Sequence, residues 1–124
     1  MTRLTSMLGL ILLLAVSATT QAHHSFNALF DVSQIISLTG EVVEFRFIAP
    51  HSYIYLRATT EDGAQDIWEV ETTTPGMLTR KGVTPVTLQP GQTITVTGNP
   101  TRDGRKLIRL LSLGMPDGQV LQIQ

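Results

Sequence analysis

The sequence predicts a small, mostly β domain that closes into a barrel of five to six strands with one short helix. Two observations predict this fold class. Apolar and polar side chains alternate in several short segments between residues 37 and 113, which is the pattern of half-buried strands. The dipeptide Thr74-Pro75, typical of a helix start, falls between the third and the fourth of these segments.

Three strands are expected before the helix, within residues 37–47, 52–58 and 66–72, with a break at Pro50. Each of them alternates between two faces. In the first strand, one face has Val43, Phe45 and Phe47 and the other has Glu44 and Arg46. In the second, Tyr53, Tyr55 and Arg57 lie opposite Ile54, Leu56 and Ala58. In the third, Ile67, Glu69 and Glu71 lie opposite Trp68 and Val70. Trp68 is expected in the core.

The helix is expected from Thr74 to Gly82, with Met77 and Leu78 facing the core. A fourth strand at 93–98 and a fifth at 106–113 follow, and the last ten residues add a turn and a short final strand. A helix between strands three and four is the order of the OB-fold, a five-stranded barrel. A small β-sandwich is the alternative that short strands of this number also fit.

The N-terminal segment has the pattern of a signal peptide. Residues 7–16 are an unbroken apolar run, shorter than the about 20 residues that a membrane-spanning helix needs. Small residues precede a cut after Ala22, so we expect a signal peptide at 1–22 and a single OB-like domain at 23–124. A cut after Ala18 and a retained N-terminal anchor are the alternatives. After processing, no stable membrane span is expected, and the mature protein is expected in the periplasm or secreted.

The composition of the chain excludes several classes of protein and of binding partner. The chain contains no cysteine, which excludes a lipid-anchored lipoprotein and disulfide stapling. The formal net charge is −1, and the loss of Arg3 with the signal makes it more negative. A near-neutral surface argues against nonspecific binding to nucleic acid or anionic lipid, so no nucleic acid partner is expected. No nucleophile elbow, phosphate-binding loop, dinucleotide fingerprint or zinc-protease motif occurs, so we expect no enzymatic activity.

The three histidines are the candidate metal ligands. A cut after Ala22 makes His23 the first residue, whose α-amine and imidazole can chelate one ion together. His24 could add a second imidazole and His51 one from the folded domain. Cu(II) favours nitrogen ligands in tetragonal geometry, so copper is the metal expected. The alternative is that the pair is a plain polar start of the chain and that His51 only hydrogen-bonds its neighbours.

Several short motifs resemble those of an uncharacterised family of small exported bacterial proteins. The family pattern has a His-His-Ser-Phe start, then Asn-Pro-His, Trp-x-x-Glu, Pro-Gly-Asp and Gly-x-Pro. The matching segments here are His23-His24-Ser25-Phe26, Ala49-Pro50-His51, Trp68-Glu69-Val70-Glu71, Pro90-Gly91-Gln92 and Gly98-Asn99-Pro100. Ala49 and Gln92 depart from the pattern, as does Val83-Thr84, where the family often has Trp-Thr. The resemblance implies export and a small β fold, places His23, His24 and His51 in the motifs, and implies no activity.

The predicted strand faces supply a second hypothesis. Tyr53 and Tyr55 share one face and could form a stacking platform, as aromatic side chains do on OB-folds. Glu69 and Glu71 also share a face, which is usually solvated and only rarely a pair for acid–base chemistry. We therefore predict an exported, non-enzymatic binding protein that handles copper. The alternative is a metal-free module of the cell envelope that binds a small ligand, a glycan or a protein partner.

Overall fold

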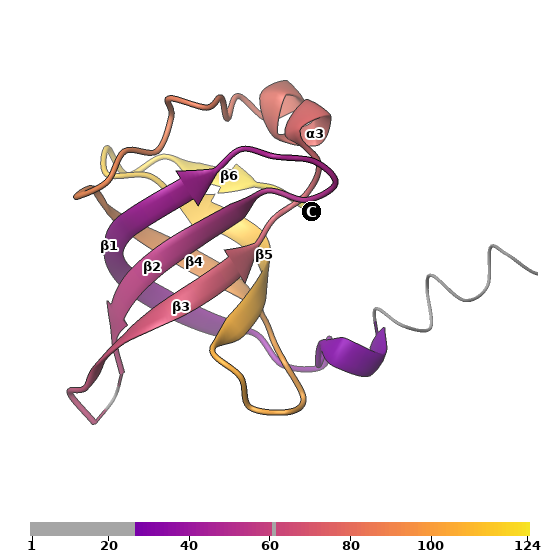
Figure 1. The fold of residues 1–124 in the computed structure, drawn as a ribbon, viewed down its shortest axis with the longest axis vertical. Coiled ribbons are helices and arrows are strands. Elements are labelled where there is room, and N and C mark those ends of the chain that lie inside the picture. The colour runs from indigo at the N-terminus through magenta and orange to yellow at the C-terminus, as the bar shows by residue number, and fades with distance from the viewer. Residues whose placement is uncertain (1–26, 61) are drawn as a thin grey trace, which may run out of the picture.

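The computed structural model of the chain describes residues 27–60 and 62–124 (Figure 1). A short helical turn at residues 27–29 precedes the barrel. The labelled elements follow in this order: β1 (Ile36–Arg46), β2 (Tyr53–Thr59), β3 (Gln65–Glu71), α3 (Pro75–Arg80), β4 (Thr93–Pro100), β5 (Leu107–Gly114) and β6 (Val120–Gln122). The ends of each strand and of the helix lie within two residues of the ends predicted from the sequence. The exception is β6, which is shorter than the region predicted for it.

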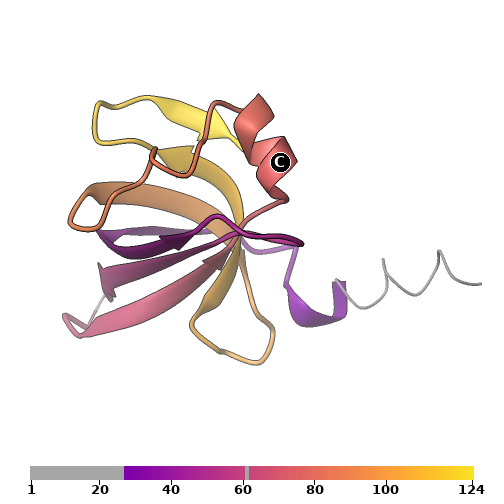
Figure 2. The same cartoon turned by 45° about the horizontal axis from the view of Figure 1, so that its top comes forward.

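The sheet closes on itself. Its strands follow the order β3-β2-β1-β4-β5-β6, and β3 also pairs in parallel with β5, from Glu69 beside Leu107 to Glu71 beside Arg109. The ring β1-β2-β3-β5-β4 with a helix between β3 and β4 is the OB-fold topology, which confirms the predicted barrel rather than a sandwich. β6 extends the sheet beyond the ring at β5, and Figures 1 and 2 show α3 at the same end of the barrel as β6.

The interior is apolar and comes from the inward residues of every barrel strand. Ile54, Leu56 and Ala58 are buried on β2, so Tyr53 and Tyr55 face outward, as the alternation predicts. The other fully buried core side chains include Val42, Val70, Ile94, Val96, Ile108, Leu110 and Leu113. Burial of such side chains stabilises the fold by about 1.5–3 kcal/mol each.

The ends of the core are filled by larger side chains. Trp68 is partly buried and packs against the core on the side of β3 opposite Glu69, as predicted. α3 begins at the N-cap Thr74, whose hydroxyl accepts from the Met77 N–H at 3.2 Å, and Pro75 occupies the first turn. Leu78 is buried from this helix, whereas Met77 is only partly buried.

A β-bulge in β1 changes which residues face the core. Val42 lies opposite Leu56 and Glu44 opposite Tyr55, so Val43 is the extra residue on β1. Before the bulge the even-numbered residues point inward, ending at the fully buried Val42. After it Phe45 and Phe47 pack on the core, in edge contact at 5.8 Å between ring centroids. The single face expected for Val43, Phe45 and Phe47 therefore omits Val42, the most deeply buried residue of this strand.

The chain before β1 is attached to the β4–β5 hairpin. The Arg102 N–H donates to Leu29 O at 2.9 Å, and the Asp31 N–H donates to Pro100 O at 2.8 Å. Phe30, which forms an isolated bridge with Thr101, is buried. The described chain thus begins at a fixed place on the domain. Among the described residues, no helix is long and apolar enough to cross a membrane.

Candidate functional site

The loop from β1 to β2 is held to the end of β3 by the residue that follows His51. Ser52 is fully buried, and its hydroxyl donates to Ile48 O at 3.1 Å. Its N–H donates to Thr73 O at 3.0 Å, and its carbonyl accepts from both the N–H and the hydroxyl of Thr72, each at 2.9 Å. A buried serine with every polar group satisfied fixes the backbone beside it. The His51 ring is therefore carried by an anchored loop, next to the cis peptide bond between Ala49 and Pro50.

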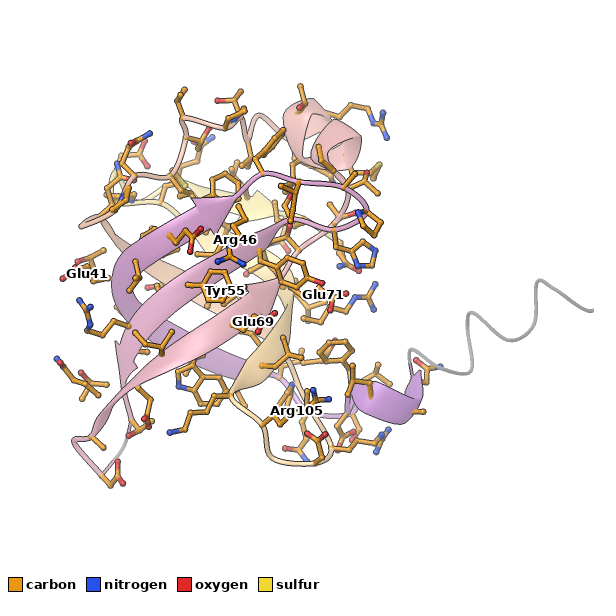
Figure 3. All side chains as sticks on the ribbon, viewed as in Figure 1. Glu41, Arg46, Tyr55, Glu69, Glu71 and Arg105 are labelled. Carbon is orange, nitrogen blue, oxygen red and sulfur yellow. The ribbon has the colours of Figure 1, made fainter. Side chains whose placement is uncertain are left out.

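This anchoring places His51 against Glu71, the last residue of β3. His51 Nδ1 lies 2.7 Å from Glu71 Oε1, and the two side chains are 41% and 14% exposed. Figure 3 shows Glu71 at the end of β3, with Glu69 next to it along the strand. The Glu71 carboxylate is the more buried of the two groups, so it holds the orientation of the more exposed His51 ring. The ring is partly exposed, and the structure shows no hydrogen bond from its other nitrogen, Nε2, to a described residue.

Glu71 also lies in a row of polar side chains across the outer face of the barrel. The strand registers pair Arg46 with Tyr53, Tyr53 with Glu71, and Glu71 with Arg109. Partial burial, followed by the charges of Glu71 and Glu69, raises the pKa of Tyr53. Burial lowers the pKa of Arg109, with Glu71 acting in the opposite direction, and the Arg109 guanidinium donates to Gln124 Oε1.

The next row contains an ion pair over an aromatic ring. Arg46 Nε donates to Glu44 Oε1 at 2.7 Å and Arg46 Nη2 donates to Glu44 Oε2 at 3.2 Å, a fork that matches two donors to two oxygens. The guanidinium carbon also lies 4.8 Å from the centre of the Tyr55 ring, as Figure 3 shows for the labelled pair. The hydrogen bond between the two side chains lowers the pKa of Glu44 and raises that of Arg46.

Glu69 differs from the other carboxylates of this face. It lies opposite Tyr55 on β2 and is partly buried, and its side chain has no hydrogen bond or ion pair with any described residue. Glu44 and Glu71, by contrast, are each in contact with a basic side chain. The outer face of β2 and β3 therefore presents two tyrosines and one carboxylate without a partner.

The structure describes one of the three predicted metal ligands. His51 is at the barrel surface as expected, whereas His23 and His24 lie outside the described residues, as does the predicted signal peptide. Within residues 27–60 and 62–124, no three His, Cys, Asp or Glu side chains lie close enough together to hold a metal ion. Asn27, three positions after His24, is fixed to the barrel because its carbonyl accepts from Arg102 Nε at 3.1 Å.

Sequence reasoning missed Glu71 as the partner of His51. It assigned Glu69 and Glu71 to one solvated strand face, and the shared face is correct. The available signal was strand pairing: the β1–β2 loop ends directly before Tyr53, which pairs with Glu71. The Pro-His and Trp-x-x-Glu motifs, separate in sequence, thus supply two residues that touch.

Comparisons with known proteins place the chain in a family. No curated protein matches the sequence. A crystal structure of a mitochondrial single-stranded DNA-binding protein from S. cerevisiae, Rim1, matches with a TM-score of 0.49 and 10% identity, over 73% of this chain and 96% of that one. The model of a family of unknown function, DUF6152, matches residues 11–108, which include all three histidines and Glu71. The chain belongs to this family, DUF6152.

Proposed function

We propose that this protein is an exported, non-enzymatic binding protein of the periplasm that binds copper through His23, His24 and His51. The observation that carries the proposal is the contact between His51 Nδ1 and Glu71 Oε1 at 2.7 Å. Histidines that bind metal through one ring nitrogen usually donate the other N–H to a carboxylate or a carbonyl. The contact is therefore the support that a metal-binding histidine needs.

Glu71 has a defined part in this proposal. With its proton on Nδ1, the His51 ring donates to Glu71 and keeps the lone pair of Nε2 available for a metal. The carboxylate also makes the imidazole a better electron donor and holds its orientation. Glu71 is a positioning residue here, and His51 is the ligand.

The remaining ligands would come from the start of the mature chain. A cut after Ala22 gives His23 a free amine, and the amine and the imidazole together form a chelate suited to Cu(II). His24 lies only three residues before Asn27, which the Arg102 side chain holds on the domain. An extended chain spans at most about 3.6 Å per residue, so the proposal requires ligands within that reach of Asn27 for each intervening position.

A second candidate function is a metal-free module that binds a ligand on the barrel face. The outward tyrosines favour it: Tyr53 and Tyr55 lie on β2, and the outer face of strands 2 and 3 is where OB-folds bind oligonucleotides and oligosaccharides. On this reading the ligand is a small molecule, a glycan or a segment of a protein partner.

We expect no nucleic acid on this face. A groove for single strands combines stacking rings with a row of free positive charges. Here five cations of the barrel strands and loops are ion-paired: Arg46 with Glu44, Arg57 with Glu41, Arg102 with Asp31, Arg105 with Asp103 and Lys106 with Asp66. Arg109 donates to Gln124. The unpaired carboxylate of Glu69 would repel a phosphate backbone.

Two measurements test the proposal. Cell fractionation with N-terminal sequencing should find the protein in the periplasm, starting at His23; a cytoplasmic product starting at Met1 would overturn export. Electron paramagnetic resonance of the Cu(II)-loaded mature protein should show nitrogen couplings, with fewer of them in His51→Ala. A spectrum of oxygen ligation alone, or one identical in His51→Ala, would overturn the copper site.

A further inference from the structure

We propose that the outer face of β2 and β3 binds a low-molecular-weight organic cation, whose ammonium or guanidinium group sits on Tyr53 beside Glu69. The inference rests on the second candidate function, that this face is a binding surface, and names the ligand class. It does not depend on the copper site.

The first observation is the partnerless carboxylate. A glutamate that loses part of its hydration is stabilised by a cationic partner, because a charge that loses hydration without gaining a partner costs free energy. Glu69 is partly buried and contacts no donor among the described residues. Arg46, a neighbouring cation, donates to Glu44 and to the Tyr55 hydroxyl instead. An external cation would supply the missing partner.

The second observation is the aromatic surroundings of this carboxylate. Glu69 lies directly across from Tyr55 and diagonally from Tyr53, a distance that long side chains bridge on a sheet. After burial and the charge of Glu71, the charge of Glu69 also contributes to the raised pKa of Tyr53, which agrees with this diagonal placement. A carboxylate beside aromatic faces attracts a cation from two directions, by its charge and through the ring quadrupole.

The third observation is that the same face already holds a cation of this kind. The Arg46 guanidinium sits over the Tyr55 ring at 4.8 Å and is balanced by Glu44. Tyr53 and Glu69 repeat the combination of ring and carboxylate, and the Glu69 side chain has no hydrogen bond or ion pair with a described residue. The charge balance of the face therefore favours a cation over a neutral sugar or an anion.

The test is an NMR titration of the mature protein with spermidine, in the presence of a chelator that removes metal. Saturable shifts of the Tyr53 and Tyr55 ring resonances are expected. Glu69→Gln should weaken binding about tenfold, since a charge-assisted contact is lost while shape is kept. Glu41→Gln is the matched control, because it removes a carboxylate that is ion-paired with Arg57 and should change the affinity less than about twofold.

Further arms separate the alternatives. Tyr53→Phe should keep binding and Tyr53→Leu should weaken it, because only the ring is required. Binding of spermidine should persist in His51→Ala, because this substitution removes a proposed copper ligand that is not part of the cation site. Saturable binding of maltotriose, but not of spermidine, would overturn the cation while keeping the binding face. No response to either probe would overturn both the inference and the second candidate function. Equal weakening by Glu69→Gln and Glu41→Gln would show a mere effect of net charge and overturn the inference.

Discussion

His51 and Glu71, which are 20 residues apart in the chain, meet at 2.7 Å between Nδ1 and Oε1 at the surface of the barrel. The buried hydroxyl of Ser52 fixes the loop of the histidine, and the pairing of β2 with β3 fixes the glutamate. The contact engages one nitrogen of the more exposed imidazole and leaves Nε2 without a hydrogen bond to a described residue. This geometry connects the OB-fold to the proposed metal chemistry.

Replacing Glu71 by Gln should weaken Cu(II) binding by about tenfold, because second-shell partners orient and polarise the histidine that they hold. Glu69→Gln is the matched control, since it removes the same charge two residues away on the same face and makes no contact with His51. Competition titration against a chelator of known Cu(II) affinity measures both. Equal affinities of Glu71→Gln and Glu69→Gln would remove the role assigned to Glu71.

Replacing Trp68 by Ala should lower the free energy of unfolding by about 3 kcal/mol, because the indole packs on the core and its removal leaves a cavity. Ile67→Ala is the control on the opposite face of β3: this side chain is 46% exposed, and its loss should cost about 1 kcal/mol or less. Urea unfolding monitored by circular dichroism compares them. A larger cost for Ile67→Ala than for Trp68→Ala would contradict this assignment of the two faces of β3.

Replacing Gly98 by Ala should destabilise the barrel by about 2 kcal/mol or more, because two strands approach too closely to admit a side chain. A Cβ at Gly98 would lie 2.2 Å from Arg109 O, a backbone atom that cannot move aside alone. Gly76→Ala in α3 is the control, because its Cβ would meet nothing closer than Arg80 Nη1 at 4.0 Å. This substitution should stabilise the helix by about 0.5 kcal/mol. Thermal unfolding of both variants should give shifts of opposite sign.

Acid should loosen the attachment of the chain before β1 through Asp31. The pKa of this carboxyl is lowered from 3.8, first because the Ser33 hydroxyl and N–H donate to it, at 2.6 and 3.1 Å. A lowered carboxyl pKa stabilises the fold fully above the unfolded value, and this contribution is lost as the pH falls through the folded value.

Asp31→Asn should accordingly reduce stability at pH 7 and flatten its decline below pH 3.8. Glu44, Asp62 and Asp103, whose pKa values are also lowered, keep part of the decline in the variant. Urea midpoints measured across the acid range provide the check. An unchanged acid limb in Asp31→Asn would mean that its hydrogen bonds do not persist in solution.

The fold could be predicted from the sequence because local signals and topology agree. Alternation in β2 and β3 assigns both faces correctly, from Ile54 on the inside to Glu71 on the outside. The helix start at Thr74-Pro75 then selects the barrel order. The bulge at Val43 could not be predicted, because it depends on pairing with Leu56 and Tyr55 rather than on the pattern of β1 itself.

The site was predictable only in part. A histidine after a proline is visible in the sequence, but its contact with Glu71 requires the register of β2 on β3 and the anchoring of Ser52. The contact between Arg46 and Tyr55 likewise depends on the pairing of neighbouring strands. The lack of a side-chain partner for Glu69 depends on it too. The prediction for His23 and His24 remains a prediction, since both lie outside the described residues.

The measurement that tests the central claim most directly is calorimetric titration of Cu(II) into three forms: the mature protein from His23, His51→Ala, and the mature protein with its α-amine acetylated. Acetylation removes the amine nitrogen as a ligand and breaks the chelate with the His23 imidazole while keeping every histidine. We predict one tight site in the mature protein and an affinity lower by about tenfold or more in both other forms, since each loses one nitrogen ligand. Equal affinities in all three forms would contradict the copper site and leave the outer face of the barrel as the binding surface.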